Sequence, residues 1–276
     1  MVDIRQTQEY ANYLKKIGWE VERVAEINYF IKKVPLLGSV IKIQRPEEIR
    51  ITKIRQLVKS HRVFQIIIEP KTELDAKFLT SIGYKLSKTP YLPTKTLILD
   101  LTKSEKVILA NLKKDARYAI KKTMNYELCT MDSKIEEFRN AWKKSVGLKR
   151  HVPPLAHLLA LKNSFKEGCL FCVYFDDSNQ RSKIIGGAIF LRADKIAYYW
   201  QAFTNKEGRK KFAQYQIVWK GILWAKAQGA KIFDFEGIYD ERFPNKAWQG
   251  FSHFKKSFGG NVVEYPGAFV KNRISI

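Results

Sequence analysis

The sequence is poor in cysteine, and this excludes a scaffold held together by disulfides. Its 276 residues include three cysteines, Cys129, Cys169 and Cys172. A small odd number argues against a fully paired secreted domain and favours a reducing compartment such as the cytoplasm. Cys169 and Cys172 form a CxxC motif within "GCLFCVYF", but this run is typical of a strand and no second pair completes a zinc site. We therefore predict core packing for the pair and no bound metal.

Long hydrophobic runs are also missing. No apolar stretch approaches the roughly 20 residues needed to span a bilayer, and the N-terminal "MVDIRQTQEYANYLKKIGW" lacks the apolar segment of a signal peptide. These features predict a soluble, cytoplasmic protein. A basic surface can still rest on anionic lipid, so peripheral contact with the inner membrane surface is compatible with the sequence.

Acidic residues are scarce relative to basic ones. The sequence contains 50 Lys and Arg residues and 27 Asp and Glu residues, which gives a formal net charge of +23 and a pI near 9.8. Such an excess raises both the association rate and the affinity for polyanions, so nucleic-acid or phosphorylated partners are favoured. A basic surface that is only solvated is the alternative.

The expected elements follow the order of a mixed α/β protein, with mostly antiparallel sheets flanked by helices. The N-terminal part predicts a helix, a three-stranded meander, a second helix, a buried strand and a third helix. The C-terminal part predicts a strand, a basic helix over residues 105–125, a short strand over 126–132 and two shorter helices. Three antiparallel strands, a long helix over 211–230, a buried strand and a terminal hairpin over 258–270 follow. A break near residues 91–96 predicts two domains, 1–95 and 96–276.

The helix expected over residues 105–125 carries basic residues on one side. Steps of three to four residues place Lys114, Arg117 and Lys121 on one face, while apolar residues occupy another. This spacing predicts a cationic ridge able to contact phosphates.

The stretch "DFEGIYDERFPNKAWQGFSHFKKSFGG", residues 234–260, ends with two lysines between Phe254 and Phe258. Surface lysines rarely lie between aromatic residues. We expect an irregular, extended segment that holds Lys255 between rings, with Lys256 pointing to the opposite side.

The order of C-terminal elements resembles the GNAT acyltransferase fold. In ordinary members a glycine-rich turn at the start of the long helix binds the pyrophosphate of the acyl donor, because free N–H groups and the helix dipole meet the anion there. Here "TNKEGRKKFAQYQIV" offers one glycine, Gly208, and no glycine pair. The usual coenzyme A cradle is therefore poorly supported.

Several distinctive motifs run along most of the chain: "QTQEYANYLKKIGWEVERV", "VPLLGSVIKIQRP", "LDLTKSEKVILANLKKDARYAIKK", "IAYYWQAFT", "WAKAQGAKIFDFEGI" and "HFKKSFGG". In these motifs and their order the chain resembles the Fem family (FemABX) of peptidoglycan-bridge aminoacyltransferases. The resemblance implies two GNAT-like halves, the N-terminal one reduced. It also implies transfer of an amino acid from aminoacyl-tRNA to an amine of a peptidoglycan precursor peptide, an ester aminolysis that needs no metal or redox cofactor.

The resemblance assigns roles to several residues. Phe254 and Lys255 match the family's FK-x-x-F motif at the active site, where the lysine is implicated in stabilising the charge that develops during transfer. Glu69 matches in position an acidic residue discussed as a general base, although an exposed structural carboxylate is an equal interpretation.

The predicted acceptor site departs from the family pattern. Tyr198 and Trp200 lie where the family has tyrosines that face the acceptor, and core packing is an equal interpretation. Around "LKRHVPPLAH" the candidates are Arg150, His151 and His157, while Asn12 stands where a phosphate-binding lysine is expected. These departures leave open a nucleotide-linked or a lipid-linked acceptor.

Two other functions compete with this hypothesis. An acyl-CoA-dependent N-acyltransferase would need the segment around Gly208 to hold a pyrophosphate. A non-catalytic tRNA-binding protein would use only the cationic ridge. The transferred amino acid, the acceptor amine and the oligomeric state have no signal in the sequence.

Overall fold

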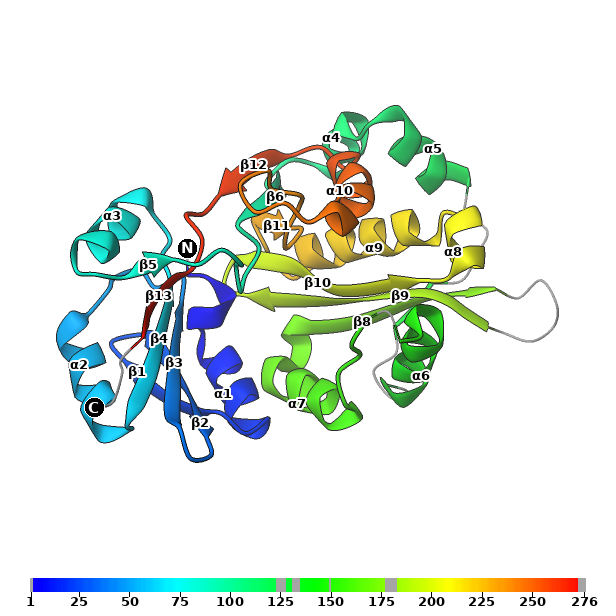
Figure 1. Ribbon diagram of the computed structural model, residues 1–276. Helices are drawn as coiled ribbons and strands as arrows, with labels where there is room; N and C mark the ends of the chain where they lie inside the picture. The colour runs from blue at the N-terminus through cyan, green and yellow to red at the C-terminus, as the bar shows by residue number, and fades with distance from the viewer. Residues whose placement is uncertain (1, 123–127, 131–134, 149, 177–182, 273–276) are drawn as a thin grey trace. The chain divides into compact units, whose positions relative to one another are not determined.

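The computed structural model describes residues 2–122, 128–130, 135–148, 150–176 and 183–272. The chain forms two compact units (Figure 1). Unit 1 consists of Met1–Lys95, Tyr239–Lys246 and Val263–Ile276, and unit 2 consists of Thr96–Ile238 and Ala247–Val262. Two segments that the sequence placed in the second domain therefore belong to unit 1.

Specific contacts explain why these late segments join unit 1. The strand β13 (Phe269–Asn272) pairs antiparallel with β4 (Val63–Glu69), and Asp240 accepts a hydrogen bond of 2.6 Å from the Thr94 hydroxyl. Arg242 donates to Asp240 at 2.8 Å and to the carbonyl oxygen of Tyr265 at 3.1 Å. Contacts between segments far apart in sequence thus complete the fold of the unit.

Unit 1 is built on a six-stranded sheet in the order β1-β2-β3-β4-β13-β5, in which β3 and β4 run parallel and the other pairs run antiparallel. The helix α1 covers one face, and α2 and α3 cover the other (Figure 1). The remaining elements are η1 (Ile4–Gln6), α1 (Gln8–Lys16), β1 (Glu20–Val24), β2 (Ile27–Val34), β3 (Gly38–Gln44), α2 (Ile51–Ser60), α3 (Glu73–Ser81) and β5 (Lys85–Leu86). The predicted meander, buried strand and three helices are confirmed.

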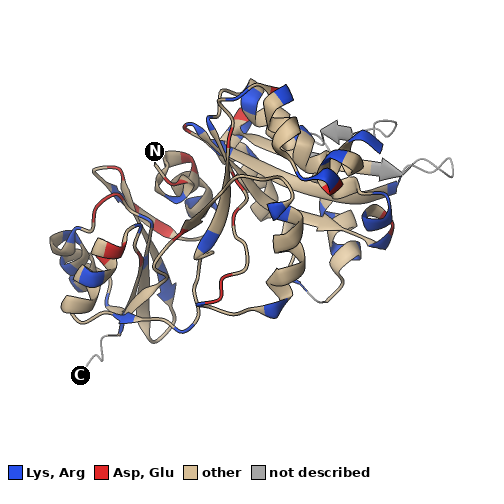
Figure 2. Cartoon of the chain, turned by 90° about the horizontal axis from the view of Figure 1, so that it is seen from above, with Lys and Arg blue, Asp and Glu red and all other residues tan. Residues whose placement is uncertain are grey.

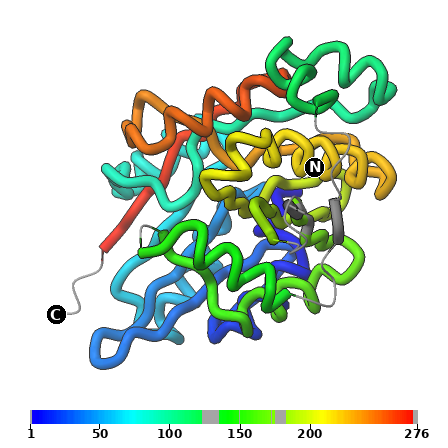
Figure 3. The backbone as a smooth tube through the Cα atoms, turned by 90° about the vertical axis from the view of Figure 1, so that its right-hand side faces the viewer, coloured from blue at the N-terminus to red at the C-terminus, as the bar shows by residue number. Residues whose placement is uncertain are grey.

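Unit 2 is built on a seven-stranded sheet in the order β12-β6-β11-β10-β9-β8-β7, with β10 and β11 parallel. Its strands are β6 (Lys95–Asp100), β7 (Leu128–Thr130), β8 (Cys169–Asp176), β9 (Lys183–Ala193), β10 (Ile196–Thr204), β11 (Ile232–Asp234) and β12 (Asn261–Glu264). Its helices are α4 (Glu105–Asn111), α5 (Lys114–Lys122), α6 (Ile135–Val146), α7 (Leu155–Phe165), η2 (Lys166–Gly168), α8 (Lys206–Lys210), α9 (Ala213–Ala227), η3 (Lys246–Trp248) and α10 (Gln249–Lys256). The helix α9 lies on one face of the sheet and α6 and α7 lie on the other, with α4 and α5 beyond α9 (Figures 1 and 3).

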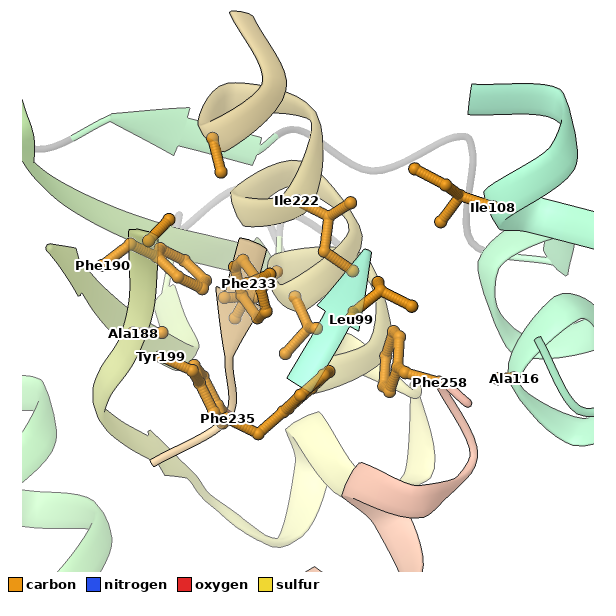
Figure 4. Close-up of a cluster of buried hydrophobic side chains, with 14 of the residues drawn as sticks. Leu99, Ile108, Ala116, Ala188, Phe190, Tyr199, Ile222, Phe233, Phe235 and Phe258 are labelled. Carbon is orange, nitrogen blue, oxygen red and sulfur yellow. The ribbon is translucent and has the colours of Figure 1, made fainter. Parts of the chain in front are cut away.

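Aromatic and aliphatic side chains fill the space between α9 and the sheet of unit 2 (Figure 4). The rings of Phe233 and Phe235 lie 5.1 Å apart, and Phe235 also meets Phe258 at 5.6 Å. Burial of large aromatic rings contributes much of the stability of such a core. Because Phe258 closely follows α10, this packing fixes the end of that helix against the sheet.

Three expectations about local structure were wrong. The predicted terminal hairpin does not form, since β12 belongs to the sheet of unit 2 whereas β13 pairs in the sheet of unit 1. The predicted basic helix is two helices, α4 and α5, with a break at Leu112 and Lys113. The segment around Lys255, expected to be extended, is the helix α10.

Lys and Arg residues outnumber Asp and Glu residues in both units (Figure 2). None of the helices in the described part of the chain combines the length and apolarity needed to cross a bilayer. Among the same residues, no group of three or more His, Cys, Asp or Glu side chains is placed to hold a metal ion. Cys169, predicted as a core residue, is buried in β8.

Candidate active site

Lys255 is a buried lysine on the inner side of α10. Its side chain is 7% exposed, whereas the adjacent Lys256 is exposed. Consecutive residues of a helix point about 100° apart, so the two lysines still face different surroundings although the segment is not extended. Only Lys255 of the pair is buried, so the two lysines have different environments.

Backbone carbonyl groups hold the Lys255 ammonium in place. The Nζ atom donates hydrogen bonds to the carbonyl oxygens of Phe235 and Gly237, both at 2.6 Å. A lysine ammonium has three N–H donors, and the described residues supply acceptors for two. Among the described residues, the third donor therefore has no hydrogen-bond acceptor.

The rings beside Lys255 are not the expected pair. Its Nζ atom lies 5.5 Å from the centre of the Tyr199 ring and 5.1 Å from that of Phe251. Phe254 and Phe258 instead pack against Tyr215, with ring centres 4.8 and 5.7 Å away. Phe254 therefore anchors α10 to the core, while Tyr199 and Phe251 offer their rings to the cation.

The electrostatic environment brings the titration of Lys255 close to neutral pH. Burial lowers the pKa of its ammonium from 10.5 to about 8, and the positive charge of Arg150 acts in the same direction. The negative charges of Glu236 and Asp234 oppose the shift. At pH 7 about nine molecules in ten would still carry the buried cation.

The irregular segment after β11 positions the two carbonyl acceptors. The Thr96 hydroxyl donates to the Asp234 carboxylate at 2.5 Å and accepts the N–H of Gly237 at 3.1 Å. Asp234 also accepts the N–H of Glu236 at 2.8 Å, and Glu236 has a φ of 52°, a conformation uncommon for residues other than glycine. This network fixes the backbone on both sides of Glu236, and so orients the carbonyls of Phe235 and Gly237 toward Lys255.

Tyr199 is a residue of this site that the sequence interpretation missed. Its ring is buried, its hydroxyl accepts a hydrogen bond of 2.6 Å from Gln214, and burial raises its pKa above the ordinary value for tyrosine. The predicted neighbour, Tyr198, is also buried. Successive residues of a strand point to opposite faces, so Tyr198 and Tyr199 cannot both face Lys255. From the sequence, strand alternation could have shown that only one of the two tyrosines faces Lys255, but not which one.

Comparisons with known proteins place the chain in a family. The sequence profile of the FemAB family matches residues 132–273, just over half of the chain. The chain belongs to the FemAB family. This finding confirms the resemblance seen in the sequence.

One curated relative is the aminoacyltransferase FemA of Staphylococcus epidermidis, which is 28% identical over 88 residues. The match covers 32% of this chain and 21% of FemA, so the chain spans about a fifth of the length of the curated relatives that it matches.

Solved structures share the fold at low sequence identity. FemX matches with a TM-score of 0.82 and 16% identity, over 98% of this chain and 92% of FemX. L-PGS from Bacillus licheniformis matches with a TM-score of 0.64 and 12% identity, over 96% and 87% of the two chains. A tandem GNAT protein from the clavulanic acid pathway has a TM-score of 0.53 and 10% identity, over 89% and 82%. These similarities confirm the predicted mixed α/β, GNAT-like fold.

Within this FemAB chain, the predicted acceptor residues occupy different settings. Trp200 is half-buried at an irregularity in the pairing of β10 with β9, between Tyr199 and Gln201. Arg150 donates to Gln201 at 3.0 Å, and its guanidinium lies 5.3 Å from the ring centre of Trp142. Arg150 is also close enough to lower the pKa of Lys255, which links it electrostatically to the site.

The two histidine candidates lie near the start of α7. His157 is half-buried on the first turn of that helix, and His151 is exposed in the segment before it. Neither histidine is among the described groups that bond to Lys255 or shift its pKa. Of Arg150, His151 and His157, only Arg150 is among the described groups whose charge acts on Lys255.

Glu69 lies at the end of β4 in unit 1 and is buried. It accepts hydrogen bonds from the Gln44 side chain at 2.8 Å and from the N–H of Leu92 at 2.6 Å. Burial raises its pKa, and the hydrogen bond from Gln44 opposes this shift. The alternative of an exposed carboxylate was therefore wrong. Asn12, in contrast, is an exposed residue of α1 whose side chain accepts a hydrogen bond from Gln8.

The break between α4 and α5 separates the roles of the predicted ridge residues. Lys114 and Lys121 are exposed on α5. Arg117 donates hydrogen bonds to the carbonyl oxygens of Ala110, at 2.8 Å, and Leu112. Arg117 thus caps the end of α4, whereas the two lysines remain accessible to solvent. An open depression beside them is lined by Lys113, Lys114, Asp115 and Tyr118.

Gly208 has a structural explanation on α8. A Cβ atom at this position would lie 2.3 Å from the carbonyl oxygen of Ile185, so close backbone packing requires a glycine. The N–H of Gly208 donates to the Asn205 side chain at 2.8 Å, which caps the helix. This N–H group is therefore already occupied and is not part of a free pyrophosphate cradle.

Proposed function

We propose that this chain is an aminoacyltransferase that moves an amino acid from aminoacyl-tRNA to an amine of a peptidoglycan precursor peptide. The observation that carries the proposal is the buried Lys255 ammonium, which two carbonyl groups hold while its third N–H donor has no acceptor among the described residues. Membership of the FemAB family and the similarity to a FemA aminoacyltransferase support the same reaction class.

The proposed chemistry is aminolysis of an ester. The neutral acceptor amine attacks the carbonyl carbon of the aminoacyl ester, a C–N bond forms, and the carbonyl oxygen becomes an oxyanion. The C–O bond to the ribose then breaks, the ribose oxygen leaves, and the proton released by the amine ends on that oxygen. Lys255 donates its third N–H to the oxyanion, which is stabilised strongly because the cation is fixed in advance and shielded from water.

Tyr199 and Phe251 support this role through their position. Their rings lie 5.5 and 5.1 Å from the ammonium and keep water from part of its surface. A ring stabilises a cation without neutralising its charge, whereas a carboxylate partner would cancel much of the field acting on substrate. The site therefore preserves a positive charge for an anion that forms during the reaction. Phe254 acts indirectly, since it packs α10 against Tyr215.

A tRNA donor is favoured over coenzyme A for two reasons. The N–H of Gly208 already donates to Asn205, and the space beside Gly208 is taken by the carbonyl of Ile185, so the usual pyrophosphate site lacks support. The net charge of +23 and the exposed Lys114 and Lys121 suit a polyanionic donor. Both observations weigh against the acyl-CoA-dependent alternative.

The proposed acceptor is the amine of a cell-wall precursor peptide on a nucleotide or lipid carrier. Arg150 is our candidate for an acceptor contact, because its charge acts on Lys255 and its side chain is held by Gln201. Trp200 has no phenol to offer a phosphate, and Asn12 has no charge. Both features favour a carrier other than the usual nucleotide, and the lipid-linked precursor is the better supported choice.

A transfer assay tests the proposal. Purified protein is given a panel of charged tRNAs and precursor peptides on nucleotide or lipid carriers, with acetyl-CoA as the competing donor. We expect amide formation from one or more charged tRNAs and none from acetyl-CoA, with Lys255→Met as the control of much lower activity. Acetyl transfer alone would replace the proposal with the acyl-CoA alternative. Tight tRNA binding with no transfer from any donor would favour a non-catalytic tRNA-binding protein.

A further inference from the structure

The turn that joins β2 to β3 presents two leucines to solvent. It follows the pattern of a type II turn, with Pro35 in the second position and a hydrogen bond of 3.2 Å from the N–H of Leu37 to the carbonyl of Val34. Leu36 is 103% exposed and Leu37 is 66% exposed. The turn lies at one end of the sheet of unit 1 (Figure 1).

Leu36 occupies a backbone conformation that disfavours it. Its φ is 67°, and the third position of such a turn favours glycine or asparagine because a Cβ atom is crowded there. No packing inside the protein compensates, since the side chain is fully exposed. A strained, exposed and apolar residue at the tip of a turn indicates that the side chain acts on something outside the protein.

Basic residues flank the two leucines. Lys33 lies two residues before Pro35, its side chain is 77% exposed, and its ammonium lies 3.6 Å from the Glu20 carboxylate. Arg62 is exposed, and its carbonyl oxygen accepts the N–H of Ser39, which places it beside the start of β3. The Glu20 carboxylate, which lies beside Lys33, also contacts the His61 ring at 2.9 Å. The surroundings of the turn therefore carry an excess of positive charge.

We propose that the β2–β3 turn inserts Leu36 and Leu37 into the interfacial region of an anionic lipid bilayer. An apolar tip with two exposed basic residues behind it, Lys33 and Arg62, matches the layers of a bilayer surface, where acyl chains lie beneath phosphate groups. Because both leucines project into solvent, they can enter a fluid lipid layer, whose molecules rearrange around them. Leu74 on α3 provides a contrast: it is 78% exposed but lies between Glu73 and Asp75, whose charges an anionic bilayer would repel.

Sedimentation with lipid vesicles tests this inference on the full chain. Vesicles of phosphatidylcholine with an equal share of phosphatidylglycerol are compared with vesicles of phosphatidylcholine alone. The wild-type chain should bind the anionic vesicles, more weakly as salt rises. The double variant Leu36→Gly, Leu37→Ser should bind them at least about tenfold more weakly, because it removes the apolar area that the bilayer would bury.

Matched variants separate this effect from unfolding. Leu36→Gly relieves the strained φ, so the double variant should keep the melting temperature of the wild type. Leu74→Ser removes an exposed leucine elsewhere in unit 1 and should bind vesicles as the wild type does. Failure of the wild type to bind anionic vesicles, unchanged binding by the double variant, or an equal decrease in Leu74→Ser would each overturn the inference. Binding is measured without tRNA or acceptor, so its result is independent of the proposed aminoacyl transfer.

Discussion

The Nζ atom of Lys255 lies 2.6 Å from the carbonyl oxygen of Gly237, and this contact fixes a buried cation without neutralising it. A carbonyl dipole orients an ammonium group, but it carries no net charge. Glu236 and Asp234 influence Lys255 through space, since within the described residues Lys255 makes no hydrogen bond or ion pair with a carboxylate. The field of the lysine therefore remains available to a substrate oxyanion.

Replacing this cation should remove much of the catalytic rate. Lys255→Met keeps most of the length and the apolar stem of the side chain but removes the charge, so single-turnover transfer from preloaded aminoacyl-tRNA should slow by about 10²–10³-fold. Binding of tRNA should stay nearly unchanged. Lys256→Met is the control, because Lys256 is exposed on the same helix, and it should keep close to full activity. Full activity in both variants would remove this lysine pair from the mechanism.

The pH dependence of the rate should report the titration of Lys255. Its pKa is lowered to about 8, so the protonated form needed for the oxyanion disappears as pH rises through that value. The acceptor amine must be neutral to attack, which makes the rate rise with pH at lower pH. We expect a bell-shaped single-turnover profile with a descending limb near pH 8. Lys255→Met should lack this limb, and persistence of the limb in the variant would assign it to another group.

The titration of Lys255 should also make the free energy of unfolding depend on pH. The pKa in the folded state, about 8, lies below the ordinary 10.5, so between these values the unfolded chain binds more protons. The contribution of Lys255 to the free energy of unfolding must therefore rise with pH across this window, by roughly 3 kcal/mol at most. Urea unfolding of wild type and Lys255→Met at several pH values from 7 to 10 isolates the difference. A constant difference between the two proteins would contradict a lowered pKa.

Thr96 should act as a positioning residue for Lys255. Its hydroxyl ties Asp234 to the N–H of Gly237, so Thr96→Val frees the turn that carries both carbonyl acceptors. The ammonium would then be less well held, and its pKa should fall further. We expect a lower rate together with a descending pH limb shifted to lower pH, and Thr96→Ser should restore both. A lower rate with an unshifted limb would indicate a general weakening of the structure instead.

Local sequence signals predicted most elements but not their distant partners. The run of β-branched residues in Val63–Glu69 is enough to specify a buried strand, and that strand is present. The break between α4 and α5 contains no proline or glycine. It depends on tertiary contacts, because the N–H of Lys113 donates to the carbonyl of Ser257 and Arg117 donates to the carbonyls that end α4. The pairing of β13 with β4 is similarly non-local.

In the candidate site, too, local sequence predicted some features whereas distant contacts determine others. The position of Lys255 among aromatic residues drew attention to it from the sequence, and the structure buries it. The rings that meet it come from Phe251, four residues earlier on the same helix, and from Tyr199 on β10. Helical spacing would have identified Phe251, but Gly250 and the turn-prone residues before it favoured an extended segment. The contact with Tyr199 depends on how α10 packs against the sheet, which no local pattern reveals.

Binding of tRNA should separate the three residues that the sequence grouped on one ridge. Lys114 and Lys121 are exposed, so each can bind a phosphate and release counterions. The double variant Lys114→Gln, Lys121→Gln should bind tRNA more weakly, and the slope of log affinity against log salt should become shallower by about 0.7–0.9 for each lysine–phosphate pair that the substitutions remove. Arg117 holds the carbonyls of Ala110 and Leu112, so Arg117→Gln should lower the melting temperature more than the double variant does. Filter binding across a salt series measures the slopes, and an unchanged slope in the double variant would exclude α5 from the tRNA-binding surface.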